Sequence, residues 1–97
     1  MTVVTVLTVE LLLFDSASLK DKRSVVRSVL QRARNKFGVA AAEVGDQDDR
    51  TRATLAFAAV SSDAQVSHAS AQKVIEFLER ERLDCQVGDV STETLSL

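Results

Sequence analysis

The 97-residue chain contains no proline, tryptophan or tyrosine, and it has only one cysteine and one histidine. Because proline, repeats and low-complexity tracts are absent, nothing marks a linker, and we expect one domain over residues 1–97. A single cysteine excludes an internal disulfide and any zinc site built from several cysteines. The remaining composition, 45% hydrophobic and 27% charged, is that of an ordinary globular domain.

Reactive side chains are too scarce to suggest an enzyme. His68 is expected to lie exposed near the start of a helix, and no motif links it to Cys85 as base and nucleophile. The glycines are dispersed at Gly38, Gly45 and Gly88, which leaves no glycine-rich phosphate loop. We therefore expect no catalytic residue and no cofactor.

Four acids gather around a predicted hairpin turn: Glu43, Asp46, Asp48 and Asp49. Hard cations bind such oxygens, but the spacing of a calcium-binding loop is absent. Aspartate is common in turns because its side chain bonds to nearby backbone groups. We expect no metal here, and instead local pairing of these acids with Arg50 or Arg52.

The apolar N-terminal run, MTVVTVLTVELLLF, raises the question of a signal peptide or membrane anchor. It lacks a basic start, Glu10 interrupts it, and its 14 residues are too few to span a bilayer. Its Val, Leu and Thr content indicates a long strand, over residues 2–14, with the odd-numbered side facing the core. We expect no membrane segment and a cytoplasmic location.

Residues 18–37 change to helical periodicity. Ser18 is a suitable N-cap, Asp21 supports it in the first turn, and Gly38 fits a left-handed C-cap. Five apolar residues of this helix fall within about 60° on a helical wheel. They are Leu19, Val26, Leu30, Ala33 and Phe37.

The rest of the chain continues the alternation of strands and helices. Strands are predicted over residues 39–45, 52–61 and 84–95, and a second helix runs from an Asp63 cap to about Leu83. This helix is expected to bury Val66, Val74, Phe77 and Leu78. The order β-α-β-β-α-β predicts an α+β, ferredoxin-like split βαβ sandwich, in which two helices cover one face of a four-stranded antiparallel sheet.

Three short motifs resemble those of the bacterial DUF503 family, also called YlxP-like proteins. They are SLKDKR at residues 18–23, AEVGDQD at 42–48 and RATL at 52–55. The resemblance covers essentially the whole chain and implies a ferredoxin-like fold in a small cytoplasmic protein without established activity. Genes of such proteins are often found near translation and ribosome-maturation genes, which implies a role with RNA or ribosomes.

Residues 18–37 carry seven Lys or Arg and only one acid, although the whole chain has a net charge of -2. Four of the cations cluster within about 60° beside the apolar stripe, along an edge of about 20 Å. They are Lys20, Arg23, Arg27 and Arg34. Lys22 lies on the opposite flank with Arg32 and Lys36, and we include it among the candidate nucleic-acid contacts.

This basic helix predicts contacts with the phosphates of RNA or a ribosomal particle. An alternative is a protein-interaction module whose basic helix meets an acidic protein surface. A third interpretation is a solvated face, since cations also keep a helix soluble and pair with acids elsewhere in the chain.

The sheet face without helices is predicted to be largely aliphatic. Its apolar residues are Val4, Val6, Leu12, Ala56, Ala58 and Val60. No aromatic side chain lies among them, so the base stacking used by RNA-recognition motifs is not expected. Such a patch predicts a homodimer packed through this face, or alternatively a monomer whose face is covered by its ribosomal or protein partner.

Overall fold

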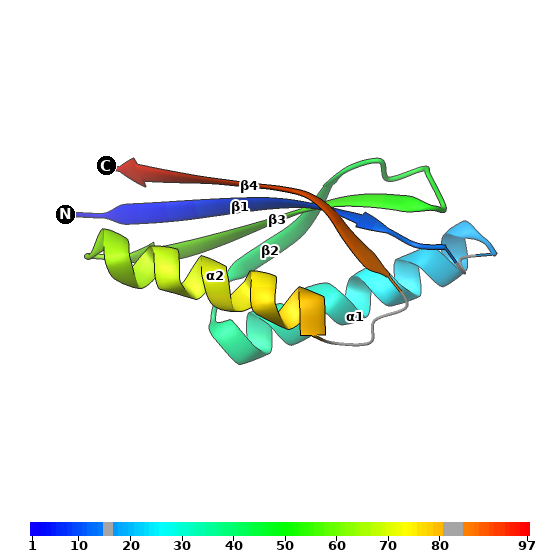
Figure 1. The fold of residues 1–97 in the computed structure, drawn as a ribbon, viewed down its shortest axis with the longest axis horizontal. Coiled ribbons are helices and arrows are strands. Elements are labelled where there is room, and N and C mark those ends of the chain that lie inside the picture. Colours follow the sequence, from blue (N-terminus) through cyan, green and yellow to red (C-terminus); the bar gives the residue numbers. More distant parts are fainter. Residues whose placement is uncertain (15–16, 81–84) are drawn as a thin grey trace.

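The computed structural model of the chain describes residues 1–14, 17–80 and 85–97, and Figure 1 shows their arrangement. The elements are β1 (Val3–Leu12), α1 (Leu19–Phe37), β2 (Ala40–Gly45), β3 (Arg52–Ser61), α2 (Ala64–Arg80) and β4 (Gln86–Ser96). The four strands pair antiparallel in the order β2-β3-β1-β4, and both helices lie on one face. This confirms the predicted ferredoxin-like α+β fold.

Strand β1 lies at the centre of the sheet because it is apolar on both sides. Its odd-numbered residues, from Val3 to Leu11, are buried beneath the helices, as predicted from the alternation. Its even-numbered residues are half-buried on the open face. Strand β3 follows the same rule, with Ala53, Leu55 and Phe57 buried against the helices.

Helix α1 begins and ends where its capping residues predicted. The Ser18 hydroxyl accepts a hydrogen bond from the Asp21 N–H at 3.1 Å, which satisfies one free donor of the first turn. Gly38 adopts a left-handed conformation, with φ of 63°, and its N–H donates to the Arg34 carbonyl. The chain can therefore reverse into β2 directly after the helix.

Helix α2 corrects one predicted core residue. Val66 is 54% exposed, whereas its neighbour Ser67 is buried. The buried stripe follows positions 67, 71, 74 and 78, so Val66 lies outside it. Ser67 tolerates burial because its hydroxyl shares a 2.8 Å hydrogen bond with Thr5. The predicted end of this helix, residues 81–83, lies outside the described residues, as does residue 84 of the predicted last strand.

Strand β4 bends where it passes Glu10. The pairing with β1 shifts between Val9 and Leu11, so that Gly88 and Asp89 together face Glu10. A side chain at Gly88 would meet the Glu10 carboxylate at 2.9 Å and its carbonyl at 3.4 Å. Glycine therefore permits the close approach of the two strands at this bulge.

Candidate nucleic-acid interface

The predicted basic edge is present on α1, and four of its five assigned residues are exposed. These are Lys20, Arg23, Arg27 and Arg34. They lie between the buried stripe and solvent because their positions are offset from Val26, Leu30 and Ala33. Among the described residues, none of these four side chains forms a salt bridge.

Arg34 has a second role at the end of this edge. Its Nη2 donates a 2.5 Å hydrogen bond to the Ala41 carbonyl of β2. The guanidinium is still exposed and has five N–H donors, so donors remain for a phosphate. Arg34 therefore connects the basic edge to the sheet.

Lys22 is not available to a nucleic acid, which corrects its assignment as a contact residue. Its side chain is fully buried, and Nζ lies 3.0 Å from the Glu43 carboxylate. The ammonium group also donates a hydrogen bond to the Asp46 carbonyl. Burial is explained by position, since Lys22 lies four and seven residues before the buried Val26 and Val29.

The Lys22 contacts join two of the three sequence motifs. The motif SLKDKR lies at the start of α1, and the motif AEVGDQD lies at the end of β2 and in the following turn. Lys22, Val26 and Val29 follow the spacing i, i+4, i+7 of one helix face, and this spacing was the signal that Lys22 is buried. Sequence reasoning missed it because a lysine is almost never fully buried unless it is paired.

The acidic turn between β2 and β3 is held by its own hydrogen bonds. Asp46 has a positive φ of 60°, and its carboxylate accepts a 2.8 Å bond from the Thr54 hydroxyl. Asp49 accepts bonds from the Thr51 N–H and hydroxyl at 2.9 and 2.8 Å. These bonds, the backbone one first, lower the pKa of Asp49, and the charge of Arg52 adds a smaller contribution.

The pairing of these acids was predicted with Arg50 or Arg52, and the structure gives Arg52 a partner outside the turn. The ion pair of Arg52 is formed with Glu10 of β1, across 3.8 Å. Within residues 1–14, 17–80 and 85–97, no three His, Cys, Asp or Glu side chains gather closely enough to hold a metal ion.

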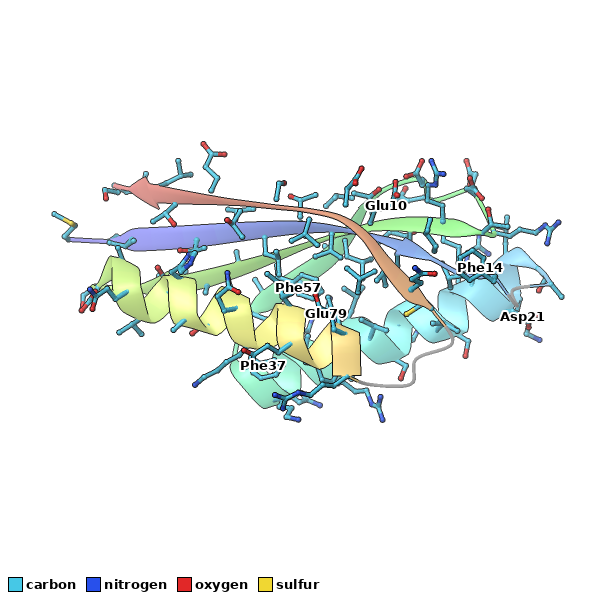
Figure 2. All side chains as sticks on the ribbon, in the orientation of Figure 1. Glu10, Phe14, Asp21, Phe37, Phe57 and Glu79 are labelled. Atoms are coloured by element: carbon cyan, nitrogen blue, oxygen red, sulfur yellow. The ribbon has the colours of Figure 1, made fainter. Side chains whose placement is uncertain are left out.

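Figure 2 places Glu10 on the helix-free side of the sheet, and Asp21, Phe37 and Glu79 on the side of the helices. Cations also lie on that side, in the last turns of both helices. Lys36, at the end of α1, covers the rings of Phe37 and Phe77, at 5.8 and 5.6 Å from their centroids. The helical side therefore carries charges of both signs, with Lys36 packed against two aromatic rings.

The open face has the composition that the sequence predicted. Val4 lies opposite Val60, and Val6 lies opposite Ala58, on the two central strands. Val60 is 69% exposed. The edge strands extend the same face, through residues that sequence reasoning did not assign: Ala40, Ala42, Val44 and Leu95.

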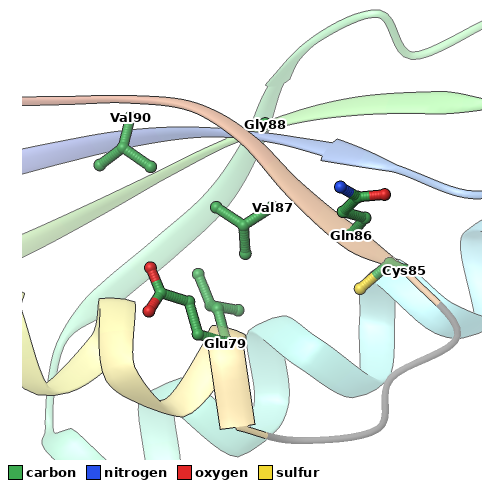
Figure 3. A pocket seen from close by; sticks show the side chains of 7 residues that line it. Glu79, Cys85, Gln86, Val87, Gly88 and Val90 are labelled. Atoms are coloured by element: carbon green, nitrogen blue, oxygen red, sulfur yellow. The ribbon is translucent and has the colours of Figure 1, made fainter.

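The structure does not bring His68 and Cys85 together. Figure 3 shows Cys85 at a hollow between β4 and the end of α2, facing Glu79 and Val87. His68 is exposed on α2, eleven residues before Glu79, which corresponds to about 16 Å along a helix. No described histidine is close enough to activate the thiol.

No helix in the described part of the chain combines the length and apolar character needed to cross a membrane.

Comparison with known proteins finds a family profile and a curated protein that are similar to this chain. The profile of the family described as "Protein of unknown function (DUF503)" matches residues 4–92. The chain is also 39% identical over 70 residues to "Uncharacterized protein YlxP" of Bacillus subtilis (strain 168), an alignment that covers 72% of this chain and 76% of that protein.

Proposed function

The chain belongs to the DUF503 family, and we propose that this member is a non-enzymatic, cytoplasmic protein that associates with RNA or a ribosomal particle through α1. The proposal depends on one observation. Four exposed cations lie along one edge of α1, and no carboxylate among the described residues forms a salt bridge with them. Nucleic-acid phosphates are the chemical partner that such an edge fits best.

The geometry sets the expected mode of contact. Lys20 and Arg34 are fourteen residues apart, so the edge extends about 21 Å along the helix. This length spans several phosphates, and their binding releases counterions. Four contacts correspond to a log–log salt slope of about -2.8 to -3.6, from about 0.7 to 0.9 per phosphate.

Binding of this kind is largely independent of base sequence. The assigned residues of the open face include no aromatic side chain on which a base could stack. Phe14, beyond the end of β1, is exposed, but it lies outside the strands. We therefore expect Phe14→Ala to leave RNA affinity unchanged.

The decisive experiment reverses two charges in the middle of the edge. The Arg23→Glu, Arg27→Glu variant should lose association with ribosomal fractions, measured by co-sedimentation, while its circular dichroism spectrum stays that of the parent. The matched control is Arg32→Glu, Lys36→Glu, which makes the same charge change on the opposite flank of α1. The control should keep most of the binding.

Two results would overturn this proposal. One is unchanged sedimentation of the Arg23, Arg27 variant. The other is an equal loss in both variants, which would mean that net charge, rather than this edge, governs binding.

The second candidate function is a protein-interaction module, in which the same cations meet an acidic protein surface. The absence of stacking aromatics on the open face favours it, because nothing there reads bases. Nuclease treatment of a pull-down separates the candidates: partners that remain bound indicate protein, and partners that are lost indicate RNA.

The open face supports a further proposal, a homodimer packed through Val4, Val6, Leu12, Ala56, Ala58 and Val60. The exposed Val60 and its neighbour Val4 form one end of this aliphatic patch, and Val6 and Ala58 continue it along the strands. Val6→Asp should break the contact, because a carboxylate facing its symmetry mate in a dry interface is costly.

A further inference from the structure

The outer edge of β4 is the least covered part of the sheet. β4 is the longest strand, with eleven residues, and it is hydrogen-bonded only to β1. Every residue from Asp89 to the end of the chain is exposed. Figure 1 shows the C-terminal half of the strand along the upper rim of the sheet, beside β1.

The register identifies which backbone groups of β4 point outward. In an antiparallel pair, residues that bond to the neighbouring strand alternate with residues whose N–H and C=O face away. The Leu97 N–H donates to the Thr2 carbonyl at 2.8 Å, and the same register pairs Leu95 with Val4. The residues that alternate with these face away from β1: Val90, Thr92, Thr94 and Ser96.

The bulge at Gly88 and Asp89 lies before the four outward-facing residues, and no feature of β4 after it blocks this edge. Natural edge strands usually carry lysine, proline or an inward-pointing charge that prevents pairing with another strand. β4 has no lysine, arginine or proline. Its Glu93 lies opposite Val6, so the carboxylate belongs to the open face and leaves the outward backbone groups free.

We propose that this edge pairs antiparallel with β4 of a second copy of the chain, about a two-fold axis at Thr92. The two sheets then form one continuous sheet. Val90 lies opposite Thr94 of the second copy, and about six backbone hydrogen bonds join the strands.

The backbone pattern of β4 fits a second copy of the same strand, and charge selects the register. A strand with outward groups at alternate positions is complementary to itself under a two-fold axis. An axis at Glu93 would place two carboxylates directly opposite each other, which is destabilising. Moving the axis to Thr92 places each Glu93 opposite Ser91 and pairs the β-branched Val90 and Thr94, which favour strands.

This contact is independent of the proposed RNA association. The sheet order places β4 at one edge and β2, next to α1, at the other. Pairing through β4 therefore leaves the basic edge of α1 exposed in both copies, on the sides of the assembly away from the contact. It also differs from packing through the open face, which uses side chains of the central strands.

The test compares three substitutions at Thr92 by light scattering at micromolar concentration. Thr92→Pro removes an N–H that faces away from β1, so the fold of one copy tolerates it while pairing is lost. Thr92→Lys keeps the N–H but places two ammonium groups opposite each other. Thr92→Ala keeps the N–H without a charge and serves as the control.

We expect the wild-type chain to have at least twice its mass of 10.5 kDa. Thr92→Pro and Thr92→Lys should each weaken the edge contact at least about tenfold, whereas Thr92→Ala should not. Thermal unfolding confirms that each variant is folded. A monomeric wild type overturns the proposal. So does an assembly that is split by Val6→Asp but stays intact in Thr92→Pro and Thr92→Lys.

Discussion

The two edges of the sheet are protected to different degrees. β2 is short, with six residues, and helix α1 lies beside it, with Arg34 bonded to the Ala41 carbonyl and Lys22 paired to Glu43. β4 is nearly twice as long, and its outer residues face solvent. A strand edge exposes a row of backbone donors and acceptors, so it must be covered, blocked or paired. One edge is covered by the chain itself, and the other is open to a partner.

The largest expected effect is at the covered edge, where Lys22→Met removes the buried ammonium. The Glu43 carboxylate, with only 17% of its side chain exposed, would lose its partner, and the Asp46 carbonyl would lose a donor. We expect the free energy of unfolding to fall by about 3 kcal/mol, because an uncompensated buried charge is costly. Urea denaturation measures it.

The Lys22→Met, Glu43→Leu double variant is the control for this prediction, since it removes both charges. It should recover most of the lost stability. If Lys22→Met alone costs less than about 1 kcal/mol, the ion pair does not fix the turn to α1.

A smaller effect is expected for Arg34→Met, which keeps the apolar stem of the side chain but removes the donor to Ala41. Loss of one hydrogen bond should cost about 1 kcal/mol in the same assay. Arg27→Met, on the same edge without a described hydrogen bond, should change stability by less than about 0.5 kcal/mol. Equal effects at the two positions would mean that Arg34 does not protect the β2 edge.

The smallest effect concerns the bend in β4. In Gly88→Ala the new methyl group meets the end of the Glu10 side chain, which can move aside and lose its pairing with Arg52. We expect a loss of about 0.5 kcal/mol, comparable to a weak surface ion pair. In a Glu10→Ala background the same substitution should cost less. No difference between the two backgrounds would place the strain at the backbone carbonyl.

Local sequence was sufficient for the elements and for the order of the fold. The alternation from Val3 to Leu11 predicted the buried side of β1, and Ser18 and Gly38 predicted both ends of α1. These features depend on contacts within a few residues, so periodicity and capping rules capture them.

The errors arose where burial depended on a distant partner. Ser67 is buried instead of Val66 because Thr5, on another element, satisfies its hydroxyl. Lys22 is buried because β2 supplies a carboxylate and a carbonyl. Neither partner can be identified from the helix in which the residue lies.

The sequence by itself determined the fold class, the apolar open face and the basic character of α1, because composition and periodicity decide which surfaces must be buried. Only the tertiary structure decided which cations stay exposed and which edge of the sheet is covered. The physical reason is that a charge or a backbone group is satisfied by groups brought close through strand register and helix packing, and these are set by the whole fold.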